Sequence, residues 1–321
     1  MPIPTQDNKF HCSYQLLNIC IIVMAVLIIF LSTHIRLGEA GLGCNPWPDC
    51  YAQFPFIDNV KGLAIPENKF GLFRSFHRSI ASLLGLNVLA VFVMALWRRK
   101  QVSLFLPLLM LTIVIFLSAL GIATPTRSFP IVTMGNILGG IALAGIGWAH
   151  FLQTKRKHAG LTLKLRFLLL ALIIQIASGA WASANYTGAA CSGLFNCSET
   201  TDVYGKMIHS FNPLRQLSLN TTYQPVPDTS SSIIQMTHRL LAVIWLVLVI
   251  YYYKKIRHRQ KTLEKPARVI VVLTLAEFAL GLGNVLFAMP LWPNTMHNLL
   301  ALGLLFAVIN LASRTMEIQN Y

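Results

Sequence analysis

Three of the nine histidines stand at matched positions in the chain. His77 is followed by Arg78 in the first half, and His238 is followed by Arg239 in the second half. His297 comes 59 residues after His238, and each of the three lies near the start of an apolar segment. Neutral imidazole is a common axial ligand for haem iron. Two histidines at matched depth on neighbouring helices make a bis-histidine haem site, and we predict one at His238 and His297.

Other roles stay open for these residues when each is taken alone. A single histidine at a membrane surface is more often hydrogen-bonded or turned toward water than bound to a metal. Arg78 and Arg239 could pair with haem propionates, because a guanidinium forks onto carboxylates. Their alternative role is to anchor helix ends at the membrane interface. His34, at the far end of the first apolar segment, is a weaker candidate for an additional ligand near the first site.

Four of the six cysteines form two pairs with the same spacing. Cys44 and Cys50 lie in one polar connection, and Cys191 and Cys197 lie in another. Both connections are rich in glycine, proline and asparagine, so each short loop can close. In an oxidising compartment each pair is expected to form a disulfide. The alternative is a redox role, in which such a disulfide exchanges with an outer thiol partner.

The composition places these residues in a membrane protein. Of 321 residues, 55% are hydrophobic and 12% are charged, and the mean hydropathy is +0.59. A soluble domain carries about 25% charged residues, and a membrane-spanning helix needs roughly 20 apolar ones. Eight apolar segments stand out, at about 14–35, 75–97, 102–123, 129–152, 163–185, 232–253, 266–288 and 294–313. We therefore predict an all-α membrane protein with eight transmembrane helices.

The basic residues orient these helices. More than half of the 26 lysines and arginines lie in the connections after the second, fourth and sixth segments. The positive-inside rule places these connections, and hence both termini, in the cytoplasm. The long connections at about 36–74 and 186–231, which carry the paired cysteines, then face outward. The same clustering accounts for the net charge of +15, so we predict no nucleic-acid partner. We interpret the first apolar run as a membrane helix, because it is long for a signal peptide and no cleavage site follows.

The chain has the pattern of a tandem repeat. Asn136 follows His77 by the same 59 residues that separate His297 from His238. The two halves superpose with an offset of 161 residues at these helix positions and of 147 at the cysteine pairs, so the outer loops differ in length. Internal duplication in membrane proteins commonly places a binding site inside each half or between them. We predict two pseudo-symmetric four-helix bundles, residues 1–158 and 159–321.

Several blocks resemble the haem A synthase (cytochrome oxidase assembly) family. They span nearly the whole chain in the family's order. The blocks are HIRLGEAGLGCNPWPDCYAQ (34–53), SFHRSIASLLGL (75–86), IIQIASGAWASANYTGAACSGLFNC (173–197), QMTHRLLAV (235–243), GLGNVLFAMPLWP (281–293) and HNLLALGLL (297–305).

The resemblance implies an enzyme of the bacterial inner (plasma) membrane. The family oxidises the C8 methyl group of haem O to a formyl group in two rounds of hydroxylation, with electrons supplied from outside. The resemblance implies haem B in the C-terminal half, held by His238 and His297, and a haem O substrate site in the N-terminal half. The implied partners are haem O synthase, the cytochrome oxidase assembly machinery and further copies of the chain.

The N-terminal half departs from the family at two positions. Arg74 stands three residues before His77, where the family usually has glutamate. Asn136 stands where the family usually has a second histidine, and a one-residue gap would make Gly135 the match instead. Neither replaces imidazole as an iron ligand. Iron would be five-coordinate through His77, with an open position for oxygen, or the haem would be held more weakly. Arg74 could instead bind a propionate.

Two other functions stay open on the sequence. The first is a non-catalytic relative that binds one haem B and acts in oxidase assembly or electron transfer. The second is a membrane thiol oxidoreductase that uses the four outer cysteines, with the histidines structural. A transporter would also suit a duplicated chain, but no broken-helix signature supports it.

Overall fold

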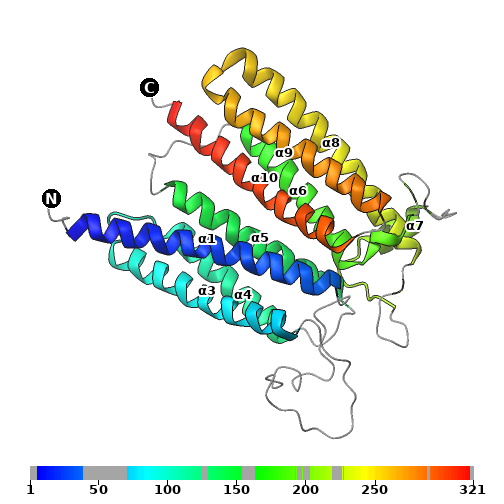
Figure 1. The fold of residues 1–321 in the computed structure, drawn as a ribbon, viewed down its shortest axis with the longest axis horizontal. Helices are drawn as coiled ribbons and strands as arrows, with labels where there is room; N and C mark the ends of the chain where they lie inside the picture. Colours follow the sequence, from blue (N-terminus) through cyan, green and yellow to red (C-terminus); the bar gives the residue numbers. More distant parts are fainter. Residues whose placement is uncertain are drawn as a thin grey trace, which may run out of the picture.

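The computed structural model describes residues 6–38, 71–123, 129–153, 163–191, 193, 197, 203–218, 226, 228–287 and 290–318. These residues are almost entirely helical (Figure 1). The helices are α1 (Gln6–Gly38), α3 (Gly71–Trp97), α4 (Phe105–Ala123), α5 (Pro130–Gln153), α6 (Leu163–Ala184), α7 (Val203–Ser210), α8 (Thr229–Arg259), α9 (Lys261–Leu286) and α10 (Leu291–Ile318), with a short 3-10 helix, η1 (Thr187–Ala189).

The long helices are those of a multi-pass membrane protein. Seven of them, in the described residues, are long and apolar enough to cross a bilayer: α1, α3, α5, α6, α8, α9 and α10. The remaining long helix, α4, has 19 residues and a shorter apolar stretch, Phe105–Gly121. Large apolar side chains such as Leu83, Ile115 and Val247 point outward, where lipid would cover them. The structure thus confirms an all-helical membrane protein, and an eighth span through α4 stays a prediction.

The long helices pack as two groups of four. In the first group α1, α3, α4 and α5 contact one another in cyclic order, and α6, α8, α9 and α10 repeat this order in the second. In the described residues, α3 and α5 are therefore diagonal to each other, as are α8 and α10. The groups meet through α5 with α6, α5 with α10, and α1 with α10. Figure 1 shows this division, with the beginning of α1 and the end of α10 at the same end of the bundle.

One apolar core runs through both groups. It includes Ile21 of α1, Val88 of α3, Leu172 of α6 and Leu304 of α10. Small residues let the two groups approach closely, as in many membrane bundles. A Cβ atom on Gly145 of α5 would lie only 3.0 Å from the Leu305 side chain of α10. This close packing fixes the depth of side chains on α10 relative to α5.

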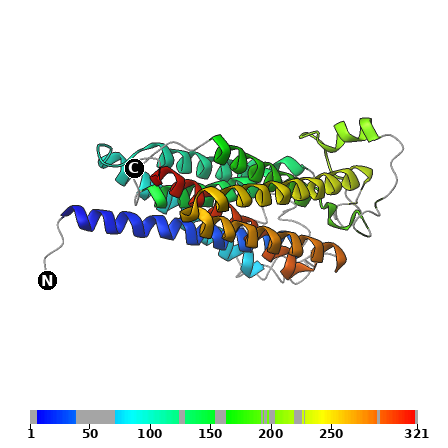
Figure 2. The same cartoon turned by 90° about the horizontal axis from the view of Figure 1, so that it is seen from above.

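The beginning of α8 is fixed by local hydrogen bonds. Asp228 accepts from the backbone N–H of Ser231, and the Ser231 hydroxyl accepts from the Asp228 N–H, which is a capping box. Arg215, whose side chain is buried, pairs with Asp228 at 2.6 Å. The cap places His238 in the third turn of α8. Figure 2 shows the short helix α7 beyond this end of the bundle.

Candidate functional site

A cavity of about 460 Å³ lies inside the C-terminal group of helices. His238 of α8 and His297 of α10 both line it. Because α8 and α10 are diagonal, the two imidazoles come from opposite sides of the four-helix group. The cavity is within the ordinary size range of cofactor sites. The sequence-predicted pair is thus brought to one cavity.

The ring of His238 is held against α6. Its Nδ1 lies 2.9 Å from Ser178 Oγ, and Ser178 donates its one hydroxyl proton to the Gln175 carbonyl oxygen at 2.8 Å. The serine oxygen therefore accepts from His238 Nδ1–H, which leaves an Nε2 lone pair for a metal. Gln175 Nε2 lies 3.3 Å from the same Nδ1 and, as a donor, also reaches the His238 carbonyl oxygen at 3.5 Å.

The ring of His297 lies against α9, beside an acidic side chain. Its Nδ1 lies 3.2 Å from Glu277 Oε1, and both side chains are largely buried. A carboxylate at Nδ1 orients the imidazole and leaves Nε2 for a partner in the cavity. Glu277 was not predicted from the sequence. A single acidic residue in a predicted membrane helix is the signal that points to it.

A glycine stands beside each of the two rings. A Cβ on Gly179 would lie 2.9 Å from His238 Cε1, and a Cβ on Gly281 would lie 3.3 Å from His297 Cε1. Gly179 is four residues after Gln175, and Gly281 is four residues after Glu277. The polar residue and the glycine therefore share a helix face in both α6 and α9. In each helix, one polar side chain therefore lies at the histidine Nδ1, and a glycine without a side chain leaves space for the ring.

A second cavity, of about 420 Å³, lies inside the N-terminal group. His77 of α3 and Asn136 of α5 both line it, from diagonal helices, as His238 and His297 do in the other cavity. Gly135 faces α4 instead, because its Cβ would lie 2.9 Å from Leu120 Cδ1. Of the two alignments that the sequence left open, the structure favours Asn136.

The two cavities differ in charge. Arg36, Arg74 and Arg78 line the N-terminal cavity, and no aspartate or glutamate among the described residues does. Arg239 and Glu277 line the C-terminal cavity. Arg36 was missed by sequence reasoning, although an arginine in the last turn of an apolar helix is a recognisable signal.

His34 lines neither cavity. It is buried between α1, α3 and α10, where its ring lies 5.3 Å from that of Phe73 and 5.0 Å from that of Trp292. A role for His34 as an additional ligand stays a prediction.

The cavities are separated by a single layer of side chains. Ile137 and Ile141 of α5 and Asn298 of α10 line both of them. After α6, Tyr186 lines the N-terminal cavity and the next residue, Thr187, lines the C-terminal one. Tyr186 has a left-handed backbone, with φ of 53°, which turns the chain between the cavities. A ligand in one cavity would therefore lie close to a ligand in the other.

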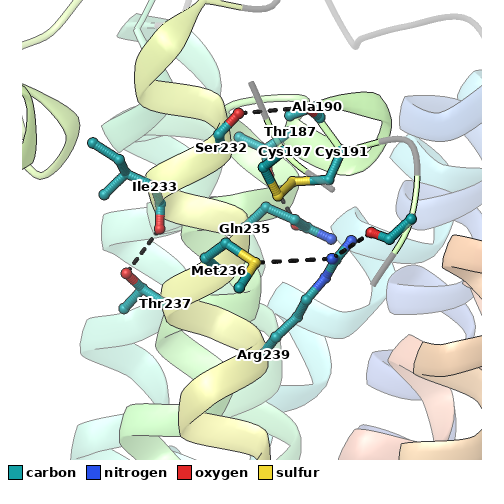
Figure 3. Close-up of a disulfide and its surroundings, with 11 residues drawn as sticks. Thr187, Ala190, Cys191, Cys197, Ser232, Ile233, Gln235, Met236, Thr237 and Arg239 are labelled. Carbon is teal, nitrogen blue, oxygen red and sulfur yellow. Dashed lines mark hydrogen bonds between the residues drawn. A yellow bond between two sulfur atoms is a disulfide. The ribbon is translucent and has the colours of Figure 1, made fainter. Parts of the chain in front are cut away.

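A disulfide lies beside the first turns of α8 (Figure 3). Cys191 and Cys197 are bonded, which confirms this predicted pair. Arg239 Nη1 donates to the Gly193 carbonyl oxygen at 2.9 Å, inside the closed loop. Ser232 of α8 donates to the Ala190 carbonyl oxygen at 3.4 Å. Two residues of α8 therefore hold the segment that carries Cys191, one on each side of this cysteine. The other predicted pair, Cys44 and Cys50, lies outside the described residues.

The donor set favours a cofactor over a bare metal ion. In the part of the chain that the structure describes, no three histidine, cysteine or acidic side chains group as metal ligands. Two imidazoles across a largely apolar cavity suit a macrocycle that supplies the other ligands of its own metal.

The comparisons with known proteins agree with this geometry. A family described as "Cytochrome oxidase assembly protein" matches residues 15–309. The chain is 28% identical to "Heme A synthase" of Shewanella oneidensis over 300 residues, which cover 86% of this chain and 89% of that protein. It is 25% identical to "Heme A synthase" of Methylobacterium radiotolerans over 170 residues, which cover 51% of this chain and 44% of that protein.

Proposed function

The chain belongs to the cytochrome oxidase assembly protein family, and on this basis we propose that it is an oxidoreductase that converts haem O to haem A. In this reaction the C8 methyl group of haem O is oxidised to a formyl group, and the product serves cytochrome oxidase. The observation that carries the proposal is the pair of adjacent cavities. His238 and His297 line one of them from diagonal helices, and His77 lines the other with Asn136 on the diagonal helix. The similarity to two haem A synthases supports the same reaction.

In this proposal, His238 and His297 hold haem B in the C-terminal cavity. The residues fit this group, because Ser178 and Glu277 occupy the Nδ1 atoms and leave both Nε2 atoms for iron. Gly179 and Gly281 leave room for both rings. When bound, haem B supplies one-electron chemistry. The protein orients the ligands and excludes water from the site.

The N-terminal cavity would take haem O as the substrate. His77 would ligate its iron from α3. Asn136, on the diagonal helix, has an amide that can donate or accept a hydrogen bond but does not replace imidazole as an iron ligand. One face of the substrate would then be open beside Asn136. Electrons would pass from the C-terminal cavity to the N-terminal cavity across Ile137, Ile141 and Asn298, which line both.

The proposed organisation follows from this assignment. Eight helices would span the bacterial inner (plasma) membrane, with both termini in the cytoplasm and pseudo-symmetric halves at 1–158 and 159–321. The shared cyclic order of the two helix groups supports the repeat. The beginning of α1 and the end of α10 lie at the same end of the bundle, which supports an even number of spans. Haem O synthase would supply the substrate, and copies of the chain would associate with one another.

A second candidate function is a haem B-binding relative without catalysis. The observation that favours it is the N-terminal cavity, where Arg74 and Asn136 stand in place of the family's glutamate and histidine. Such a protein would use the intact C-terminal pair in oxidase assembly or electron transfer.

One experiment separates the two candidates. The full chain is expressed with a haem O synthase in a host that makes no haem A, and membrane haems are separated by chromatography and mass. The proposed reaction predicts haem A above the level of a host without the chain. His77→Ala should abolish it, and Arg166→Gln, an exposed change on α6, should not. Absence of haem A with the wild-type chain would favour the second candidate.

A further inference from the structure

Arg36 is a buried cation that faces a cavity. Its side chain is only 2% exposed, and it lines the N-terminal cavity from the last turn of α1. In the part of the chain that the structure describes, its Nε and Nη2 atoms have no hydrogen-bond partner. A buried guanidinium requires both hydrogen bonds and a counter-charge. The cavity is the direction from which these can come.

Two further arginines share this end of the cavity. Arg74 and Arg78 lie in the first two turns of α3, and α3 packs against α1. Arg74, His77 and Arg78 have the spacing i, i+3 and i+4, which places all three on one face of the helix. The last turn of α1 and the first turns of α3 therefore bring three guanidinium groups and one imidazole to the same place.

Among the described residues that line this cavity, none is an aspartate or a glutamate. An anionic ligand in the cavity would supply the counter-charge for buried Arg36, and the chemistry of that ligand follows from the donors. A guanidinium binds carboxylates through two parallel hydrogen bonds. An iron porphyrin carries two carboxylates on one edge and a metal at its centre. The two carboxylates suit a group of arginines at one end of a cavity, and the central metal suits His77.

We propose that Arg36 and Arg74 form the site that binds the two carboxylates of an iron porphyrin in the N-terminal cavity. Arg74 is then a specificity residue, because it gives this cavity a positive charge where the family usually has a negative one. The identity of the porphyrin as haem O rests on the proposed function, but the carboxylate site does not.

The test compares two ligands that differ only in these charges. Purified full-length protein with its C-terminal site loaded is titrated with iron protoporphyrin IX and with its dimethyl ester. Binding is followed by quenching of tryptophan fluorescence. The wild type should bind the diacid about tenfold or more tightly than the diester, because hydrogen bonds to charged groups are lost in the ester. The ratio is compared between variants, so partitioning of the ester into detergent cancels.

Arg36→Gln should bring this ratio close to one and leave binding of the diester unchanged. Arg36→Lys keeps the charge but loses the fork, so its ratio should be intermediate, and it serves if the glutamine variant does not fold. Arg166→Gln, on the exposed face of α6, should keep the wild-type ratio. Equal binding of both ligands by the wild type, or a wild-type ratio in folded Arg36→Gln, would overturn the proposal.

Inorganic phosphate tests for a simple anion site. Displacement of the diacid by millimolar phosphate would also overturn the porphyrin assignment, and failure to displace it would support the assignment. The titration measures binding alone. A chain that shows the expected ratio but forms no haem A would therefore contradict the proposed function and leave the carboxylate site standing. A chain that forms haem A but binds the diacid and the diester equally would support the proposed function and contradict the carboxylate site.

Discussion

Glu277 Oε1 lies 3.2 Å from His297 Nδ1, at the edge of the C-terminal cavity. The matching nitrogen of His238 contacts a hydroxyl and an amide, from Ser178 and Gln175. The two proposed iron ligands are therefore held by different chemistry, a carboxylate on one side and neutral groups on the other. A carboxylate partner makes an imidazole the stronger electron donor to a metal.

Removing the charge of Glu277 should change the haem without removing it. Glu277→Gln keeps a hydrogen-bond acceptor but donates less electron density through His297, so the midpoint potential of the bound haem should rise. Glu277→Ala should lose about 10- to 100-fold in haem affinity. Spectroelectrochemical titration of the purified protein measures the first effect. The matched control is Glu264→Gln, an acidic residue near the start of the same helix that pairs with Arg268. An unchanged potential would show that Glu277 does not act on the ligand.

A methyl group at Gly179 should displace His238. The added Cβ would lie 2.9 Å from the ring, whereas at Gly281 the corresponding distance to His297 is 3.3 Å. Gly179→Ala should therefore reduce haem affinity by about tenfold or more, and Gly281→Ala should reduce it less. Gly303→Ala on α10 is the control, because nothing lies within 4 Å of its added Cβ. Haem content per chain after purification gives the order of haem affinity among the variants. Equal content in all three variants would show that Gly179 and Gly281 do not make room for the histidine rings.

The N-terminal cavity should accept a second imidazole. Asn136 lies on the helix diagonal to that of His77, as His297 does to that of His238. Asn136→His should therefore increase retention of haem in this cavity and add a second low-spin, bis-histidine spectrum to the first. The measurement is haem per chain together with the optical spectrum. If haem stays at the wild-type amount, then His77 and position 136 are not opposed across a porphyrin.

The disulfide should contribute stability rather than haem ligation. The loop that it closes accepts a hydrogen bond from Arg239 and attaches to α8. Replacing Cys191 and Cys197 by serine should lower the free energy of unfolding by about 2 kcal/mol, with haem still bound. Thermal unfolding followed by the haem spectrum gives the change. Cys12→Ser with Cys20→Ser, at the free cysteines, should leave it unaltered. Complete loss of haem in the variant that lacks Cys191 and Cys197 would show that the disulfide is needed for haem binding as well as for stability.

Much of the fold could be predicted because its signals are local. Long apolar runs gave the helices, and the histidine pair marked the site, since hydropathy and residue type are visible in one sequence. The beginning of α8 was predicted too late, at 232, because the capping box of Asp228 and Ser231 extends the helix. The short helix α7 was missed because it is amphipathic and too brief for a membrane span.

The parts of the site that escaped prediction depend on packing between helices. Glu277 and the two glycines contact histidines of neighbouring helices that lie 16 or more residues away in the sequence. Arg36 joins Arg74 and Arg78 only because α1 packs against α3. The spacing of residues along one helix does not predict contacts between side chains of different helices. The rotation of α5 about its axis, which turns Asn136 toward the N-terminal cavity and Gly135 toward α4, is likewise not visible in the sequence.

The most direct measurement is the haem composition of the purified wild-type chain after expression with a haem O synthase. Extracted haems are resolved by chromatography and mass and counted per chain. We expect about one haem B per chain at His238 and His297, together with haem A formed from haem O in the N-terminal cavity. Haem B alone, with no haem A above the control without the chain, would contradict the proposed reaction.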